Sequence, residues 1–293
     1  MTAVETTWDG LEIAADDPRG ATVVVRRPVD GEHFEYLLLH RAHHGPDFAG
    51  PWAWTPPAGA RQPGEAVEPA ALRELREEAG IDGVDIHPVD LSDGWARFYA
   101  EVPADTRVDL IDDEHDDYQW VTPAQAGRLC RPSAVARQVP IVDTIPATRF
   151  TFREATDADT PRLTAWRRSA HIAPWLPDAP GEDATGHITL ADGRPAGYAA
   201  HRPGRPGTVR IEFFLADDEA VSRGLGATFL WSYLRQVVIP AHPRVEHVAA
   251  LVGTKNRPGQ RALERAGFRR RGGLGDGEYA RAVYSLDRAH WFG

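Results

Sequence analysis

Apolar and polar positions predict helices and strands in the first half of the chain. The block Tyr36–Arg41 predicts a buried strand, and Pro123–Leu129 predicts a helix. From residue 68 or 69 to about residue 79 the residues are good helix formers, with Pro69 suited to the first turn and Gly80 placed for a left-handed C-terminal cap. We therefore predict one helix over this stretch, connected to the strand by a Gly/Pro-rich loop.

This predicted helix has two chemically different faces. At roughly 100° per residue, one face is apolar and the other is acidic. The apolar face carries Ala71, Leu72, Leu75 and Ala79, and the acidic face carries Glu74, Glu77 and Glu78. Three carboxylates within one turn repel each other unless a cation lies among them, and oxygen ligands favour Mg²⁺ or Mn²⁺ over zinc. The alternative is a solvated acidic face without a metal.

The second half repeats none of this pattern and predicts a further domain. Prolines interrupt the stretch after Cys130, and alternation resumes at residue 149. We predict strands at 149–153, 187–190, 196–202, 209–216, 245–252, 268–271 and 279–287, and helices at 157–170, 226–238 and 258–265. The expected fold class is α/β (α+β) in two domains, 1–140 and 149–293, joined by a linker at 141–148.

Composition narrows the classes of partner. The chain has 293 residues, a formal net charge of −10 and one cysteine, Cys130, which cannot form an internal disulfide. The negative charge argues against nucleic-acid or anionic-membrane partners and favours cationic ones, including a polycationic amine. No apolar run reaches membrane-spanning length and the start lacks a signal pattern, so we expect a cytoplasmic protein that acts on small molecules. The sequence gives no oligomeric state.

Residues 59–81 carry the most specific motif. They match G-x5-E-x7-R-E-U-x-E-E-x-G-U, where U is a bulky aliphatic residue, at Gly59, Glu65, Arg73, Glu74, Leu75, Glu77, Glu78, Gly80 and Ile81. This segment resembles the box of the Nudix pyrophosphohydrolases. The resemblance implies an α/β/α sandwich and Mg²⁺- or Mn²⁺-dependent hydrolysis of nucleoside-diphosphate-linked compounds. In it the three glutamates bind metal, Arg73 orients them, and Gly59 and Glu65 shape the loop.

The flanks of this box extend the resemblance. Trp52 and Trp54 lie in an entry segment similar to that of diadenosine-tetraphosphate-type Nudix hydrolases, where they would stack on a base or simply pack. Ala58 stands where such relatives often have a basic residue. Glu114, in an acidic stretch before a final strand, is the candidate for an extra metal ligand or base; the alternative is a solvated acid.

The second half resembles the GNAT N-acetyltransferases, in particular the aminoglycoside 6′-N-acetyltransferases. The resemblance rests on the glycine turn between a strand and a helix, on Asn256, and on the ending Ala262–Phe268. It implies acetyl-coenzyme A binding, with the pyrophosphate held at the helix N-terminus. The predicted cofactor contacts are Ser222, Arg223, Gly224, Leu225, Gly226, Ala227 and Asn256.

Other residues of this half are candidates for the acceptor side. Glu212, on the central strand, is the candidate base, or else a structural or substrate contact. His171 and Trp175 would line the acceptor pocket, or would only pack. Two positions depart from the family pattern: Val221 opens the pyrophosphate motif, and Leu263 replaces a tyrosine that would protonate the leaving thiolate.

Together these features predict a bifunctional enzyme, a hydrolase fused to an N-acetyltransferase that acts on a small amine. Two alternatives remain open. In one, the first half is a nucleotide sensor that regulates the transferase without hydrolysis. In the other, an active hydrolase is joined to a transferase-like module that binds without catalysis.

Overall fold

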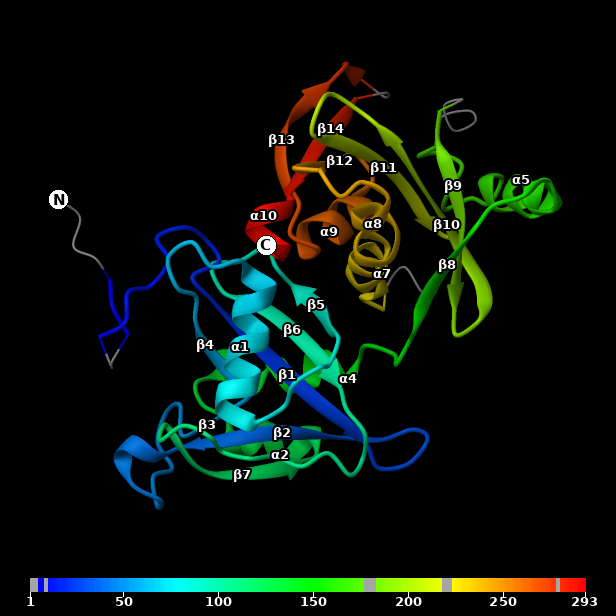
Figure 1. Cartoon of the computed structure of the whole chain (residues 1–293). Helices are drawn as coiled ribbons and strands as arrows, with labels where there is room; N and C mark the ends of the chain where they lie inside the picture. The colour runs from blue at the N-terminus through cyan, green and yellow to red at the C-terminus, as the bar shows by residue number, and fades with distance from the viewer. Residues whose placement is uncertain (1–4, 8–9, 177–182, 218–222, 278–279) are drawn as a thin grey trace. The chain divides into compact units, whose positions relative to one another are not determined.

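The chain folds into two compact units (Figure 1). The computed structural model describes residues 5–7, 10–176, 183–217, 223–277 and 280–293, without the side chain of His44. The N-terminal unit is Met1–Ile145 with His290–Gly293, and the C-terminal unit is Pro146–Ala289. The division falls inside the stretch 141–148 that we expected as a linker, although a helix occupies part of that stretch.

The N-terminal unit holds one mixed sheet and the predicted carboxylate helix. Its elements are β1 (Gly20–Pro28), β2 (Phe34–Arg41), η1 (Ala42–His44), β3 (Trp54–Thr55), β4 (Ala58–Ala60), α1 (Val67–Ala79), β5 (Ile86–Asp90), β6 (Ala96–Glu101), β7 (His115–Val121), α2 (Pro123–Leu129), α3 (Ser133–Ala136) and α4 (Gln138–Asp143). The strand order is β3-β2-β1-β6-β5, with β4 paired to β1 and β7 to β2. The pair β1–β6 is parallel and the pair β1–β2 antiparallel.

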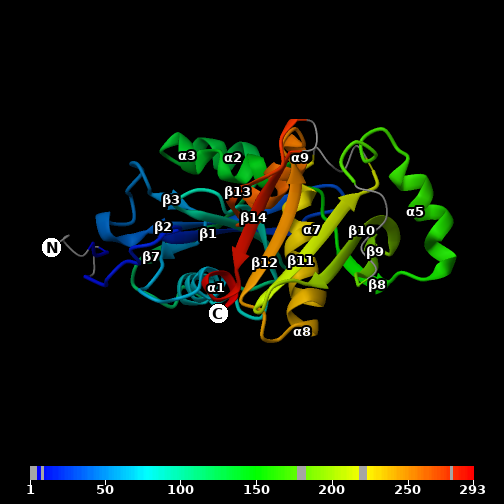
Figure 2. The same ribbon diagram turned by 90° about the horizontal axis from the view of Figure 1, so that it is seen from above.

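Helices cover both faces of this sheet, as the α/β/α expectation requires. Figure 2 shows α1 on one side of β1 and β2, and α2 and α3 on the other. Buried Arg26 of β1 donates to the carbonyl oxygens of Val142 and Ile145 and pairs with Glu101. A buried guanidinium is tolerated only where acceptors satisfy it, so these bonds fasten α4 and the turn after it to the sheet.

The prediction of α1 is confirmed, including its end. The helix covers Val67–Ala79, and Gly80 adopts the left-handed conformation with φ 67° while its N–H bonds to the carbonyl of Arg76. Helix α2 begins and ends at the predicted residues because Thr122 and Gln125 form a capping box around Pro123.

The C-terminal unit is a second mixed sheet with helices. Its elements are β8 (Phe150–Glu154), η2 (Asp157–Asp159), α5 (Thr160–Arg167), β9 (Thr185–Ala191), β10 (Arg194–Pro203), β11 (Thr208–Leu215), α7 (Leu225–Tyr233), η3 (Leu234–Val238), α8 (Ile239–Ala241), β12 (His247–Gly253), α9 (Arg257–Arg265), β13 (Arg269–Leu274) and β14 (Arg281–Asp287); α10 (Arg288–Phe292) closes the chain. The strand order is β13-β14-β12-β11-β10-β9-β8.

Helices pack on both faces of this sheet too. Phe229 of α7 contacts the rings of Phe150, Phe152 and Phe213 on one face. On the other face a separate core cluster includes Ile188, Tyr198 and Phe214, against which Leu163 and Trp166 of α5 pack. The predicted helix at 226–238 is present but ends in a π-helical segment, η3, and the predicted helix at 157–170 is shorter, ending at Arg167.

The central parallel pair of the second sheet separates partway along its length. Strands β11 and β12 are paired only over Thr208–Ile211 and His247–Ala250, although β11 continues to Leu215 and β12 to Gly253. A parallel pair that parts in this way leaves backbone groups of both strands without a ladder partner on the open side. This opening positions the cavity described below.

Two expectations from composition can be compared with the structure. Among the described residues no helix is long and apolar enough to span a membrane. Cys130 is a buried free thiol whose pKa burial raises to about 11.

Candidate functional sites

Helix α1 presents its three predicted metal ligands in three different environments. Glu78 is 3% exposed and accepts a hydrogen bond of 2.8 Å from the backbone N–H of Ala58. The side chain of Glu74 is 14% exposed, and that of Glu77 is 47% exposed. The prediction that all three share a polar face apart from the core was therefore wrong for Glu78, because strand β4 packs over that side of the helix.

Arg73 lies at the centre of the carboxylate group, as predicted. Its guanidinium donates to Glu65 at 2.8 Å, to Glu74 at 2.7 Å and to Glu77 at 3.0 Å, and it also donates to the carbonyl of Ala60. Charge-assisted bonds of this kind fix geometry strongly. Arg73 therefore ties the β4 loop to the helix and orients two of the candidate ligands.

Gly59 lies directly against this group. A Cβ added at Gly59 would overlap the carboxylate of Glu74, so no other residue fits there without moving that side chain. The glycine of the motif thus leaves room for the Glu74 carboxylate, and its φ angle is not unusual.

Burial sets the charges of the carboxylates. Burial raises the pKa of Glu74 to about 7, with further contributions from the charges of Glu77 and Glu114 and an opposing one from Arg73. Burial also raises the pKa of Glu78 well above its usual value, and the charges of Glu74 and Asp112 add to the shift. Five carboxylates therefore act on one another here, and a cation among them would remove this cost.

The candidate ligands Glu74, Glu77, Glu78 and Glu114 have the oxygen donors that a hard divalent cation prefers. All candidate donors are carboxylates, which suit Mg²⁺ or Mn²⁺. Within the described residues, however, no three His, Cys, Asp or Glu side chains converge closely enough to form a ready-made metal site. Arg73 donates to both Glu74 and Glu77, so these two carboxylates are held by the guanidinium and not by each other.

The flanking candidates lie near the same group or at the surface. The charge of Glu114, just before β7, reaches Glu74, so the structure brings it to the carboxylate group. Trp52 is 51% exposed and has φ 67°, an uncommon conformation for a bulky residue. Trp54 is less exposed and packs on the ring of His40.

Two residues near this site were not singled out from the sequence. Asp112 acts on the buried Glu78, and Arg41 at the end of β2 acts on both Glu78 and His115. The buried Nε of Arg41 has no hydrogen-bond partner in the described part of the chain. An arginine at a strand end carries no motif, so only the topology reveals its proximity.

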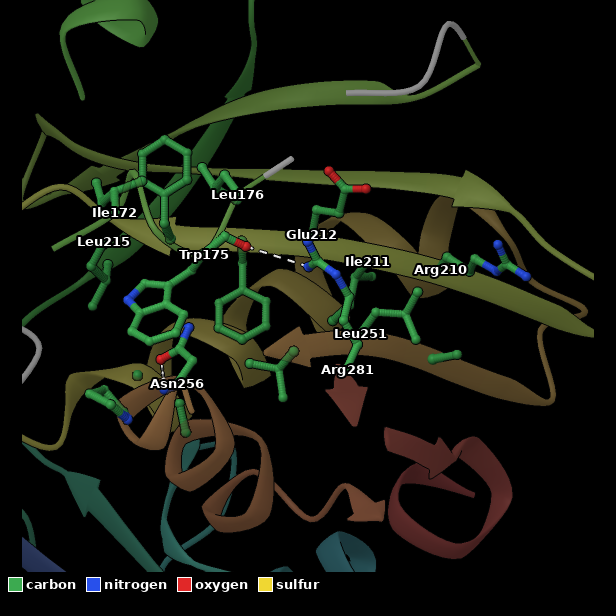
Figure 3. Close-up of a pocket in the computed structure, with 18 of the residues that line it drawn as sticks. Ile172, Trp175, Leu176, Arg210, Ile211, Glu212, Leu215, Leu251, Asn256 and Arg281 are labelled. Atoms are coloured by element: carbon green, nitrogen blue, oxygen red, sulfur yellow. Dashed lines mark hydrogen bonds between the residues drawn. The ribbon is translucent and has the colours of Figure 1, made fainter. Parts of the chain in front are cut away.

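A cavity of about 840 Å³ opens in the C-terminal unit between the separated strands β11 and β12 (Figure 3). Five of the predicted site residues line it: His171, Trp175, Glu212, Gly226 and Asn256. Trp175 packs over Gly253 at the end of β12, and the side chain of Asn256 lies on the same side of this glycine. The structure thus brings together residues that are up to 85 positions apart in the chain.

The glycine turn precedes α7, as predicted. Gly224 is left-handed with φ 81° and is the N-cap of α7, whose first turn contains no acidic residue. Gly226 lies against Ala262 of α9 and lines the cavity, Leu225 and Ala227 are buried, and Arg223 is exposed. Ser222 and Val221 lie outside the described residues. Asn256 caps α9 by accepting from the N–H of Gly259, so it has a structural role in addition to lining the cavity.

The chemistry of the cavity depends on few polar groups. Glu212 projects from β11, with its carboxylate 3.8 Å from Arg202, and His171 contacts the carbonyl of Leu215 at 3.3 Å. Leu263 is fully buried and does not line the cavity. Among the described residues of the lining, Thr208 has the one hydroxyl group, and no tyrosine is present.

Sequence comparisons match the N-terminal unit to known proteins. The family model described as NUDIX domain matches residues 17–143. A bis(5′-nucleosyl)-tetraphosphatase (asymmetrical) from Mus musculus is 30% identical over 122 residues, which are 35% of this chain and 74% of that protein. The protein of the same description from Sus scrofa is 46% identical over 57 residues, 18% of this chain and only 33% of its own length.

Comparison with solved structures gives partial matches to an acetyltransferase and to a hydrolase. An aminoglycoside acetyltransferase AAC(6′)-Ib in complex with coenzyme A is 22% identical, with a TM-score of 0.44, over 48% of this chain and 96% of the other. A C. elegans Ap4A hydrolase is 26% identical, with a TM-score of 0.35, over 42% of this chain and 93% of the other.

Proposed function

Because this chain belongs to the NUDIX family through residues 17–143, we propose that its N-terminal unit hydrolyses a phosphoanhydride bond in a nucleoside-diphosphate-linked compound, with Mg²⁺ or Mn²⁺. The observation that carries the proposal is the carboxylate group of α1. Glu74, Glu77 and Glu78 lie around Arg73, and the charge of Glu114 reaches Glu74. A solvated acidic face would not bury Glu78 or hold Glu74 against a glycine.

The residues of this unit have separate roles in the proposal. Glu74, Glu77 and Glu78 hold the metal ion, which when bound neutralises pyrophosphate oxygens and activates water. Arg73 orients the ligands, and its hydrogen bond to Glu77 must break before Glu77 can bind the metal ion. Glu114 takes up the proton of the attacking water, and exposed Trp52 stacks on the base of the substrate.

Dinucleoside tetraphosphates are the first compounds to test, because the pig and mouse relatives are bis(5′-nucleosyl)-tetraphosphatases. The purified chain is incubated with Mg²⁺ and a panel of dinucleoside polyphosphates and nucleotide sugars, and the products are separated by ion exchange. We expect release of nucleotides by the wild type and a loss of at least about a hundredfold in Glu77→Gln, since removing one charged ligand weakens the metal site strongly. Glu32→Gln, which removes the same charge from an exposed loop, is the matched control. No turnover on any compound, or equal turnover in both variants, would reject the proposal.

For the C-terminal unit we propose acetyl transfer from acetyl-coenzyme A to a small amine. Three features support it: the separation of β11 from β12, the left-handed glycine before α7, and the cavity that both border. The first N–H groups of α7 suit a pyrophosphate. Glu212 lies partway along the cavity and takes the proton from the amine as its nitrogen bonds to the acetyl carbon. The C–S bond then breaks, and the thiolate takes a proton from water.

The buried position of Leu263 favours a second candidate, a module that binds acetyl-coenzyme A without catalysis. No tyrosine among the described residues lines the cavity to protonate the leaving thiolate. Calorimetry with acetyl-coenzyme A, followed by thiol release with a panel of amines, separates the two. Binding without thiol release on any amine identifies the module, whereas release that falls at least about tenfold in Glu212→Gln, but not in exposed Asp157→Asn, identifies the transferase.

A further inference from the structure

The charge of the chain is divided unequally between its two units. Residues 1–145 contain 12 Lys and Arg against 27 Asp and Glu, whereas residues 146–289 contain 21 against 16. The formal net charges are therefore −15 and +5, and the last four residues contain no Lys, Arg, Asp or Glu. The acidity of the whole chain belongs to the unit with the carboxylate helix, so it gives no reason to expect a cationic acceptor in the other unit.

Arginines dominate the charged lining of the C-terminal cavity. The described lining residues include four arginines, Arg202, Arg205, Arg210 and Arg281, and a single carboxylate, Glu212. In the sheet register Arg202 of β10 lies directly opposite Arg210 of β11. Because side chains alternate along a strand, Arg210 and Glu212 share the sheet face on which Arg202 projects. Like charges opposite each other destabilise a sheet unless a counter-charge is supplied.

The protein supplies little of that counter-charge. The Glu212 carboxylate lies 3.8 Å from Arg202, beyond hydrogen-bond length. The buried Nε of Arg202 has no hydrogen-bond partner in the described part of the chain. The Arg202 side chain as a whole is 33% exposed, so its outer N–H groups can donate to an anionic ligand, which would supply the counter-charge.

Three of these arginines, Arg202, Arg205 and Arg210, lie at the end of the cavity away from the proposed cofactor site, whereas Arg281 donates to the carbonyl of Trp175 near the other end. The glycine turn and α7 follow the C-terminal end of β11, whereas Arg210 lies five residues before Leu215, about 16 Å away at roughly 3.3 Å per residue. Figure 3 shows Arg210 and Asn256 at opposite ends of the pocket. Glu212, the proposed base, lies on β11 between Arg210 and the end of the strand at Leu215. The arginines therefore border the space that an acceptor would fill.

We propose that the acceptor of this unit is a small amine that also carries an anionic group, a carboxylate or a phosphate, bound by Arg202, Arg205 and Arg210. This inference rests on the proposed transferase function. Guanidinium groups bind both anions in bidentate geometry, and the anchored molecule presents its amine to Glu212. A polycationic aminoglycoside would instead place ammonium groups against these three guanidinium groups, which disfavours it.

Matched pairs of amines test the acceptor class with the full-length chain. Glucosamine 6-phosphate is compared with glucosamine, and Nα-acetyl-lysine with Nα-acetyl-lysinamide, so that each pair differs by one anion. A polycation, kanamycin, is included. Thiol release from acetyl-coenzyme A should show kcat/KM at least about tenfold higher for the anionic member of one pair or both, and the better pair identifies phosphate or carboxylate. Equal values within both pairs, or a preference for kanamycin, would overturn the proposal.

Arginine variants test the location of the anion site. Arg210→Gln and Arg202→Gln should each raise KM for the anionic acceptor at least about tenfold while changing KM for acetyl-coenzyme A less than about twofold. Arg194→Gln, at the other end of β10 and exposed, should leave both unchanged. If KM for acetyl-coenzyme A rises instead, the arginines bind the phosphates of the coenzyme and the proposal is wrong.

A binding measurement keeps this inference separate from the catalytic proposal. If acetyl-coenzyme A binds but no amine releases thiol, the transferase function fails, and calorimetric titration with the same pairs still decides whether the arginines form an anion site. Binding of glucosamine 6-phosphate or Nα-acetyl-lysine that is lost in Arg210→Gln supports the anion site. Binding equal to that of glucosamine or Nα-acetyl-lysinamide, which lack the anionic group, excludes it.

Discussion

The carboxylate group of the N-terminal unit and the arginine-lined cavity of the C-terminal unit are opposite in charge and in origin. Gly59, Arg73 and the three glutamates lie within 20 consecutive residues, held mostly by one helix. The cavity is lined by residues of five strands (β10, β11, β12, β13 and β14), two helices (α7 and α9) and the segment before β9. The first site is encoded locally and the second by topology. The comparison teaches that charge has to be considered unit by unit, because the net value of −10 describes neither half.

The largest expected effect tests whether the buried carboxylate is a ligand. We predict that Glu78→Gln lowers nucleotide hydrolysis by about a thousandfold and leaves acetyl transfer unchanged. Gln is nearly isosteric with the carboxyl group and can still accept from Ala58, so the fold is retained while the ligand charge is lost. Both activities are assayed on one preparation, with circular dichroism as the check on folding. Hydrolysis within threefold of the wild type would show that Glu78 is only structural.

A smaller effect is expected from Gly59→Ala. The added methyl group overlaps the Glu74 carboxylate and displaces it from Arg73, so we predict a loss of hydrolysis of about a hundredfold. Gly127→Ala in α2, where an added Cβ meets nothing within 4 Å, is the control and should keep full activity. A Gly59→Ala variant with normal kcat would mean that the position of Glu74 is not critical.

The difference in origin also explains what the sequence could predict. Helix α1 with its Gly80 cap and helix α2 depend on neighbours in the chain, and both helices were predicted correctly. The burial of Glu78 depends on β4, which pairs with β1 about 40 residues earlier, so periodicity along the helix alone could not show it.

In the C-terminal unit the strands were largely predicted but their register was not. The opposition of Arg202 and Arg210 and the nearness of Arg281 to Trp175 follow from how the strands pair. From sequence, single arginines on half-exposed strands are indistinguishable from ordinary surface charges. The separation of β11 from β12, on which the cavity depends, has no local signal at all.

Ligand-induced stability sharpens the comparison further. We predict that Mg²⁺ stabilises the N-terminal unit and acetyl-coenzyme A the C-terminal unit, each by about 2.7 kcal/mol at a hundredfold excess over its Kd. In scanning calorimetry each ligand should raise the Tm of one unit by several degrees. Glu78→Gln should abolish the Mg²⁺ effect and keep the coenzyme effect. Equal Mg²⁺ stabilisation of the wild type and this variant would place the ion elsewhere.

The smallest expected effect concerns acid and the C-terminal unit. In the C-terminal unit, buried His201 of β10 lies against the rings of His187, His242 and Tyr233. Burial, together with the charges of His242 and His187, lowers the pKa of His201 from 6.5 to about 4. Burial also lowers the pKa of His187, against the opposing charge of Glu154.

The sign of the effect follows from these shifts. The unfolded chain takes up a proton near pH 6.5, but the folded unit holds His201 neutral until about pH 4, so stability is lost as the pH falls through this window. Between pH 7 and 5 we predict a loss of at most roughly 2 kcal/mol, measured by urea unfolding at each pH. His201→Gln should flatten the dependence, whereas His247→Gln, an exposed residue of β12, should leave it unchanged. Glu74 has the opposite effect on the N-terminal unit. Because burial raises its pKa to about 7 in the folded state, its contribution to the stability of that unit is lost as the pH rises from about 4.5 through 7. Equal acid sensitivity in wild type and His201→Gln would mean that water reaches these histidines and that burial does not hold His201 neutral in the folded unit.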